Sequence, residues 1–367
     1  MRPAPFAARL LLASSAAVLA AGLAMGAYHL LAPRSVSITV DPGAAPEQMW
    51  DGKEALVVDE VAGFRPRRSC TQTHPMAALD ATKPDTIVKH RDAFGFLREG
   101  ELPASLDLPR VVVVGDSHVD GVVSTADNAT SILERELQAK EAPCYVLNAG
   151  CGLYSLWQSV LRARDLLPRF TPRVVVVVVF MGNDFLELDN QKVPHLDDDL
   201  HELGAATESG TETTSARQRD LAIDKQFEQV FWQGLNQALY LHRDPARIDA
   251  LARKARHAVD AMESAAKDKG ADVLWVLLPS FDLVFPDKVE GLGPLVKEVV
   301  QGGAQMRMHD AFREVLGSAG ADSLDLLEVF RADRRLSLYA IDFHIYRDGH
   351  RVLADALEPL LEKRLVR

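Results

Sequence analysis

The chain has 367 residues, a hydrophobic fraction of 47% and a formal net charge of -11. This length and apolar content are sufficient for one large α/β domain with additional segments, or for two domains. The acidic balance argues against a nucleic-acid partner, because binding to phosphates requires clustered basic side chains. Three cysteines exclude a disulfide scaffold, and none has the spacing of a zinc site.

The N-terminal segment, residues 1–34, has the pattern of a targeting sequence. Arg2 and Arg9 stand before or at the start of an apolar run over residues 10–28 that is rich in Ala and Leu. Basic residues ahead of such a run indicate a cytoplasmic N-terminus and export of the rest of the chain. A stretch of ~19 residues is long enough to cross a bilayer as a helix. We expect an inner-membrane anchor with the remainder facing the periplasm or exterior, and secretion after cleavage is the alternative.

Residues 35–107 are polar and rich in Pro, Gly and Arg, with short β-like runs such as residues 55–58. We interpret them as a linker and a small accessory segment that packs on the main domain. The main domain is expected over residues 108–366. Within it, the long polar stretch near residues 188–219 lacks periodicity, which is typical of a surface insertion.

From Arg110 onward, predicted strands alternate with predicted helices. Such alternation indicates a parallel sheet with helices on both faces. Ser155 and Gln158 have the spacing of a capping box, and Asp244 before Pro245 is a candidate N-cap. The predicted strands cover residues 111–114, 144–147, 174–180, 272–278 and 324–329, and the predicted helices cover residues 129–140, 155–167, 227–241, 245–269, 306–316 and 349–365.

The first predicted strand runs directly into a turn that ends on a serine. Four valines precede Gly115, Asp116 and Ser117, so the strand is expected to be buried on both faces. In open α/β sheets, ligands bind at the carboxyl ends of the strands. Ser117 is therefore a candidate nucleophile, provided that a base and an oxyanion site accompany it.

Three further polar blocks stand at the ends of predicted elements: residues 148–152, residues 181–184 and residues 342–344. Together with Ser117 they supply the residue types that acyl transfer requires. His344 would accept the proton of Ser117, and Asp342 would orient the imidazole. The oxyanion donors would be the backbone N–H of Ser117, a backbone N–H at Gly152 or Leu153, and the side-chain amide of Asn183. This chemistry requires no metal and no organic cofactor.

These blocks resemble the motifs of the SGNH (GDSL-type) hydrolases, in the same order and over about residues 108–366. The resemblance implies a three-layer α/β/α fold with a mainly parallel, flavodoxin-like sheet of about five strands. The chain is also similar to exported, membrane-anchored members of that family that are related to polysaccharide O-acetylation and deacetylation. Their C-terminal motif has the form Asp-x-His-x-x-x-x-Gly-His, which here spans residues 342–350.

The chain departs from the family pattern at several places. Leu153 occupies the position where the family has its oxyanion glycine, and a single residue separates Asp342 from His344. His118, directly after the nucleophile, is unusual and is a candidate substrate contact. His350 is the rival to His344, but we expect it to support packing.

The predicted function is a serine esterase or O-acyltransferase that acts through an acyl-enzyme on Ser117. The resemblance implies an ester substrate, typically acetyl, on a carbohydrate or envelope polymer, with membrane contact through the N-terminal helix. A lipase or lysophospholipase is an alternative, and a catalytically weak glycan-binding module is another. We expect the acidic residues 197–199 to form a solvated loop rather than a metal site.

Overall fold

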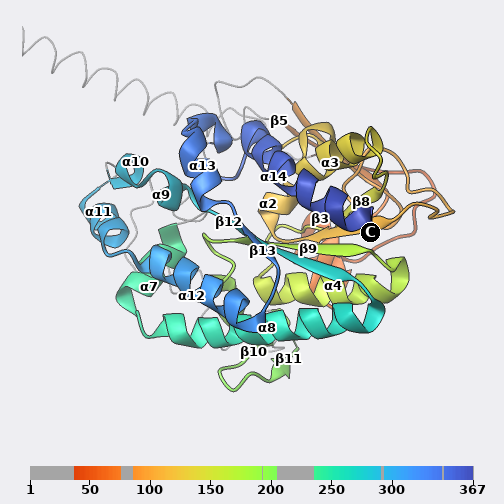
Figure 1. The fold of residues 1–367 in the computed structure, drawn as a ribbon. Helices are drawn as coiled ribbons and strands as arrows, with labels where there is room; N and C mark the ends of the chain where they lie inside the picture. Colours follow the sequence, from red (N-terminus) through yellow and green to blue (C-terminus); the bar gives the residue numbers. More distant parts are fainter. Residues whose placement is uncertain are drawn as a thin grey trace, which may run out of the picture.

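The computed structural model describes residues 37–75, 86–191, 193–204, 235–290, 293–340 and 343–366 (Figure 1). The apolar run over residues 10–28, the start of the helix expected over residues 227–241, and Asp342 lie outside this part of the chain. Within the described residues, no helix combines the length and apolarity that a bilayer crossing requires.

A five-stranded parallel sheet lies at the centre of the molecule. The strands stand in the order β13-β12-β9-β7-β8, and every neighbouring pair is parallel. Numbered along the domain, this is the 2-1-3-4-5 order of flavodoxin-like sheets. The predicted fold class is therefore confirmed. The strands are β7 (Arg110–Val114), β8 (Tyr145–Asn148), β9 (Val174–Phe180), β12 (Asp272–Leu278) and β13 (Ser323–Asp325).

Helices cover both faces of this sheet and complete three layers (Figure 1). One face carries α4 (Leu156–Phe170), α8 (Arg247–Lys269) and α12 (Ala304–Ala319). The other carries α3 (Ala129–Gln138) and α14 (Arg347–Leu365). Because helices press on both sides, every residue of β9 is buried, which explains its run of six valines.

Several predicted boundaries are confirmed, and others need correction. The capping box of Ser155 and Gln158 opens α4 as expected. Asp244 does not cap α8, whose N-cap is Ala246. Helix α12 continues through Gly317 to Ala319 and is capped by Gly320, where a φ of 66° suits glycine.

The strand predicted over residues 324–329 is also wrong beyond its first residues. Strand β13 ends at Asp325, and the following helix α13 spans Leu327–Asp333. Leu327 and Phe330 are buried three residues apart, which is a helical spacing rather than the alternation of a strand.

The segment before the main domain forms two three-stranded antiparallel sheets, ordered β1-β5-β6 and β2-β3-β4. It packs on the main domain through hydrogen bonds to α4 and its cap. The hydroxyl of Tyr154 donates to the Phe64 carbonyl at 2.6 Å, and the Gln158 amide donates to the Ala62 carbonyl at 2.8 Å. The strands are β1 (Ser37–Val40), β2 (Met49–Trp50), β3 (Lys53–Asp59), β4 (Gly63–Pro66), β5 (Cys70–Pro75) and β6 (Thr86–Arg91).

Shorter elements complete the described chain. All three cysteines are buried and free. The remaining helices are α2 (Ser117–Asp120), α7 (Asn236–Arg243), α9 (Phe281–Val284), α10 (Pro286–Glu290) and α11 (Pro294–Gln301), with 3₁₀ turns over Thr125–Asp127, Leu186–Asp189 and Leu336–Leu338 and a small hairpin of β10 (His195–Leu196) and β11 (Glu202–Leu203).

Candidate active site

The nucleophile candidate stands where β7 turns into α2. Ser117 is the first residue of that helix, and the Asp116 carboxylate caps it by accepting the His118 N–H at 2.9 Å. The turn needs glycine at position 115. A Cβ atom there would collide with the Val119 side chain and lie 2.9 Å from the Val178 carbonyl oxygen. Close packing of α2 against the sheet therefore fixes the serine at the carboxyl edge.

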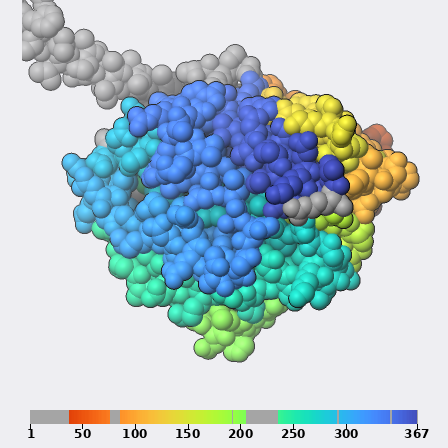
Figure 2. All heavy atoms as spheres, in the orientation of Figure 1, coloured from red at the N-terminus to blue at the C-terminus, as the bar shows by residue number. Residues whose placement is uncertain are grey.

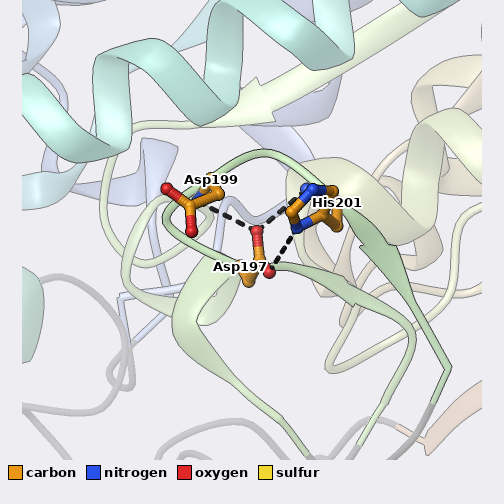
Figure 3. A group of neighbouring side chains, drawn as sticks. All are labelled: Asp197, Asp199 and His201. Carbon is orange, nitrogen blue, oxygen red and sulfur yellow. Dashed lines mark hydrogen bonds and ion pairs between the residues drawn. The ribbon is translucent and has the colours of Figure 1, made fainter.

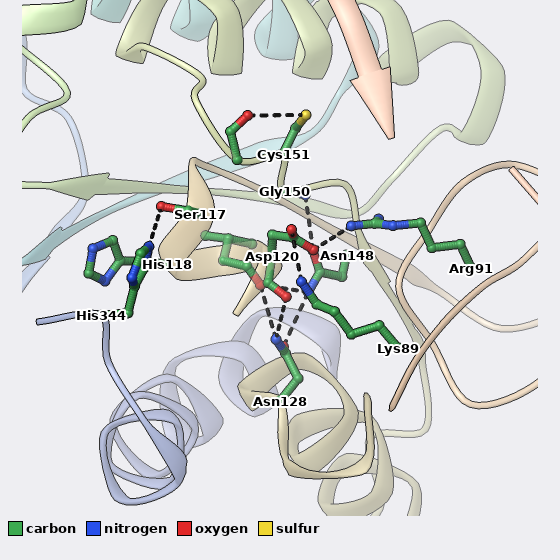
Figure 4. A network of polar contacts seen from close by, with 12 residues as sticks. Lys89, Arg91, Ser117, His118, Asp120, Asn128, Asn148, Gly150, Cys151 and His344 are labelled. Carbon is green, nitrogen blue, oxygen red and sulfur yellow. Dashed lines mark hydrogen bonds and ion pairs between the residues drawn. The ribbon is translucent and has the colours of Figure 1, made fainter. Parts of the chain in front are cut away.

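His344 lies beside this serine although 227 residues separate the two in sequence. Its Nε2 atom is 2.9 Å from Ser117 Oγ, and the side chain is buried (Figure 4). Asp116 Oδ2 is farther from the same hydroxyl, at 3.4 Å. The structure thus brings together the predicted nucleophile and the predicted base. The predicted orienting residue, Asp342, lies outside the described residues.

His118 is fully buried, which corrects its assignment as a candidate substrate contact. Its ring stacks on Phe180 with centroids 3.5 Å apart, and its Nδ1 accepts the Ile345 N–H at 3.3 Å. Burial lowers the pKa of His118 well below its usual value, which keeps the ring neutral. The imidazole therefore holds the segment that carries His344 against α2.

His350, the rival base, points elsewhere. It is buried in α14, and its Nδ1 atom accepts the backbone N–H of Ala129 at 3.3 Å. Burial lowers the pKa of His350 to about 3. Its contact joins α14 to α3, in keeping with the packing role expected from the sequence.

The candidate oxyanion residues come from two loops beside Ser117. A Cβ atom on Gly152 would be 3.8 Å from Ser117 Cβ, so this backbone passes close to the nucleophile. Leu153 follows with a φ of 73° and a side chain that is 48% exposed. It adopts the left-handed conformation that glycine favours, at the position where the sequence resemblance implies glycine.

Asn183 stands in the turn after β9, which neighbours β7 in the sheet. Its Oδ1 atom is buried and has no hydrogen-bond partner among the residues that the structure describes. The next residue, Asp184, accepts the Phe180 N–H at 2.9 Å and closes the turn. Asp184 is thus a structural residue of the loop, as the sequence suggested.

Two buried carboxyl groups near Ser117, those of Asp116 and Asp184, have raised pKa values. Burial raises the pKa of Asp116 to about 6. Burial also raises the pKa of Asp184 well above its usual value, and the nearby Asp116 carboxylate adds to this effect. This influence of Asp116 on Asp184 reflects the proximity of the loops after β7 and β9, which carry Ser117 and Asn183.

Two asparagines anchor α2 through hydrogen bonds to its backbone. Asn148 and Asn128 both donate to the Val119 carbonyl, at 2.9 Å and 3.0 Å (Figure 4). Asn148 also accepts the Gly150 N–H at 3.0 Å, which ties the second loop to the same point. Sequence analysis included Asn148 in a motif block but did not identify this anchoring role.

Sequence analysis also missed a charged cluster at the end of α2. Lys89 and Arg91 of β6 both pair with the Asp120 carboxylate, and the Lys89 distance is 2.9 Å (Figure 4). Both cations are buried, and the Arg91 side chain is only 1% exposed. The accessory sheet formed by β1, β5 and β6 therefore contacts the short helix that begins with Ser117.

The acidic residues 197–199 lie on the surface, as predicted. Ligand atoms of Asp197, Asp199 and His201 fall within 4.8 Å of one another (Figure 3). The Asp197 carboxylate already accepts the backbone N–H groups of Asp199 and His201 and contacts His201 Nδ1 at 2.9 Å. These bonds account for the cluster as a turn stabilised by its own side chains.

Comparisons with known proteins give only distant likenesses. No family model matches the chain, and no curated protein matches it. Among solved structures, it is similar to LAE5, an α/β hydrolase from the metagenome of Lake Arreo, Spain, at 13% identity and a TM-score of 0.41, over 70% of this chain and 96% of that one. It is also similar to the acetyl xylan esterase AlAXEase, at 16% identity and a TM-score of 0.41, over 68% and 98%.

A third similar structure is a catalytic mutant of Axe2, an acetylxylan esterase from Geobacillus stearothermophilus. The identity is 15% and the TM-score 0.37, over 69% of this chain and 94% of that one. Assignment of a function therefore depends on this chain's own residues and geometry. These define an α/β protein with a half-buried serine next to a buried histidine at the carboxyl edge of its sheet.

Proposed function

We propose that this chain is a serine ester hydrolase or O-acyltransferase of the SGNH (GDSL-type) class. The observation that carries the proposal is the 2.9 Å contact between Ser117 Oγ and His344 Nε2 at the carboxyl edge of a flavodoxin-like sheet. Further support comes from the four motif blocks, which occur in the family's order along the chain.

In the proposed reaction, the Ser117 hydroxyl attacks the carbonyl carbon of an ester while His344 Nε2 takes its proton. Collapse of the tetrahedral intermediate breaks the bond to the alcohol, which leaves with the proton from His344. An acyl group then remains on Ser117. Water releases it as a carboxylic acid, or an acceptor hydroxyl takes it as a new ester, with His344 again moving the proton.

The negative charge on the carbonyl oxygen needs donors that are fixed before the reaction. We assign this role to the backbone at Ser117 and at Gly152 or Leu153, together with the Asn183 amide. The proximity of Gly152 to Ser117 supports the backbone part of this assignment. Asp342 is the proposed orienting acid, on the strength of the sequence motif.

We propose acetyl esters on a carbohydrate or envelope polymer as the substrate class. The support is the family motif over residues 342–350 and the N-terminal pattern, which predicts export and attachment to the inner membrane. An acyl-enzyme route serves both hydrolysis and transfer, and the acceptor decides between them.

The test is hydrolysis of p-nitrophenyl acetate by the full chain in detergent, compared with its Ser117→Ala and His344→Ala variants. We expect activity in the parent chain and a loss of about 10³-fold or more in each variant. Activity that rises with acyl chain length would favour a lipase. Absence of activity in the parent chain would favour a glycan-binding module.

A further inference from the structure

A second polar site lies beyond the catalytic pair, between the β10–β11 hairpin and the start of α8. It is a cavity of about 440 Å³, within the range of small-ligand pockets. Most such pockets are lined by apolar side chains, whereas this one is lined mainly by charged and polar groups. The hairpin projects at the lower edge of the surface, in light green (Figure 2).

Four charged side chains form a rigid frame in the wall of this cavity. Arg247 binds Asp189 through two nitrogens, at 2.9 Å and 2.5 Å, and binds Asp198 through two more contacts, at 3.0 Å and 2.9 Å. Lys254, which is almost completely buried, contacts the same two carboxylates at 2.9 Å and 3.1 Å. Such interlocked pairs hold their remaining donors and acceptors in fixed positions.

His195 adds an acceptor to the cavity wall. The residue is only 7% exposed, and its Nδ1 lies 2.9 Å from the Val193 carbonyl oxygen. That carbonyl can only accept, so Nδ1 carries a proton, and in the neutral tautomer Nε2 is an acceptor. No hydrogen bond from a described residue occupies Nε2. A nine-tenths buried polar side chain in a cavity wall thus has bonding capacity left for a ligand.

The charges of the cavity select against anionic ligands. Arg247 and Lys254 are each neutralised by Asp189 and Asp198, and Asp197 and Asp244 add two more carboxylates to the lining. An anion would meet these four acids, and both basic groups of the lining are already paired with two of them. A neutral ligand with many hydroxyls, which both donate and accept, satisfies the frame without disturbing it.

The cavity is connected to the candidate active site by one short segment. Asp189 ends the 3₁₀ turn that begins three residues after Asn183, and the Glu187 N–H donates to the Asn183 carbonyl at 3.0 Å. Six residues span at most about 20 Å when fully extended, and the turn makes this distance shorter. A polymer of several sugar units is long enough to reach both places.

We propose that this cavity is a binding subsite for a neutral carbohydrate chain. The subsite would hold sugar units next to the one whose ester is presented to Ser117, so its catalytic meaning rests on the proposed function. Binding of carbohydrate to the cavity does not depend on the proposed function, because the cavity and the catalytic pair share no side chain.

Titration calorimetry with the full chain in detergent tests this inference. The probes are xylohexaose, cellohexaose and mannohexaose, which are neutral, and hexagalacturonate, which is anionic. We expect binding of at least one neutral probe and weaker binding of hexagalacturonate. Gln191→Trp, which fills the cavity from an exposed lining position, should weaken neutral binding about tenfold or more.

Two variants complete the design. Glu314→Trp places the same side chain at an exposed position of α12 that does not line the cavity. This variant should bind the neutral probes as the parent chain does. Asp198→Ala removes a largely exposed partner of Arg247 and is the alternative cavity variant if Gln191→Trp does not fold. The inference is overturned if no neutral probe binds, if hexagalacturonate binds best, or if folded cavity variants bind normally. Because the probes carry no ester, loss of esterase activity in Ser117→Ala leaves this result unchanged.

Discussion

Lys89 of β6 places its Nζ atom 2.9 Å from the carboxylate of Asp120, the last residue of the four-residue helix that begins with Ser117. Arg91 binds the same carboxylate. Burial alone would raise the pKa of Asp120, but the neighbouring cations lower it on balance, so the carboxylate stays ionised between them. The accessory sheet thus supports the position of the candidate nucleophile.

Asp120→Asn should therefore impair both stability and catalysis. Loss of the carboxylate leaves two buried cations without their partner, which costs about 3 kcal/mol or more in the free energy of unfolding. We also expect kcat to fall about tenfold with a small change in KM, because α2 shifts relative to His344. Chemical denaturation and p-nitrophenyl acetate kinetics measure the two effects.

Glu134→Gln is the matched control for this prediction. Glu134 pairs with buried Arg98 at 2.8 Å, and both partners are as buried as those of the Asp120 cluster. This variant should lose stability and keep kcat. An equal fall in kcat for the two variants would show that general destabilisation, not positioning of Ser117, explains the Asp120 effect.

Asn183→Ala should lower kcat about 10²–10³-fold with little change in KM, because the amide is assigned to the transition-state oxyanion. Asn183→Asp keeps the size of the side chain but replaces the donor with a negative charge, so it should lose at least as much. Steady-state kinetics on p-nitrophenyl acetate provide the measurement. A normal kcat in the alanine variant would remove Asn183 from the oxyanion site.

Leu153→Gly should stabilise the protein slightly. Leucine with a φ of 73° is strained, whereas glycine adopts this conformation freely. The strain of about 1–2 kcal/mol exceeds the entropic cost of glycine, about 0.5–1 kcal/mol, so we expect a net gain of about 0.5 kcal/mol. Leu153→Ala retains a Cβ atom and should show no gain in thermal unfolding. Equal stability changes in the two variants would contradict this explanation.

His350 should make the protein less stable in acid. Its folded pKa of about 3 lies below the usual value of 6.5, so between these pH values the unfolded chain binds a proton that the folded chain does not. The contribution is fully present above pH 6.5 and is lost as pH falls toward 3, by about 1.4 kcal/mol per pH unit.

The check is the free energy of unfolding of the parent chain and of His350→Asn, measured between pH 7 and pH 4. Asparagine does not titrate, so the stability deficit of the variant should shrink as the pH falls. A deficit that is constant over this range would contradict a neutral, buried His350.

The sequence predicted the fold and the proximity of Ser117 to His344 because both depend on local signals. The valines of β7 and β9 mark strands buried on two faces, and Ser117 and His344 stand in motifs at the ends of elements. Loops that follow parallel strands and loops that precede the returning helices meet at the carboxyl edge of the sheet, so proximity of the two residues followed from topology.

Other features depend on contacts that no local pattern encodes. Lys89 lies in a polar segment, and its pairing with Asp120 requires the accessory sheet to fold back on α2. The sequence suggested that a substrate could contact His118, but Phe180 of β9 stacks on its ring. Edge strand β13 is too short to be separated by pattern from the helix that follows it.

The central claim is that His344 activates Ser117 as a nucleophile. The most direct measurement is covalent labelling of the full chain with a fluorophosphonate, followed by peptide mass spectrometry. We predict one adduct, on Ser117, formed rapidly in the parent chain and about 10³-fold more slowly in His344→Ala. An adduct on another residue, or equal labelling rates in the two proteins, would contradict the account.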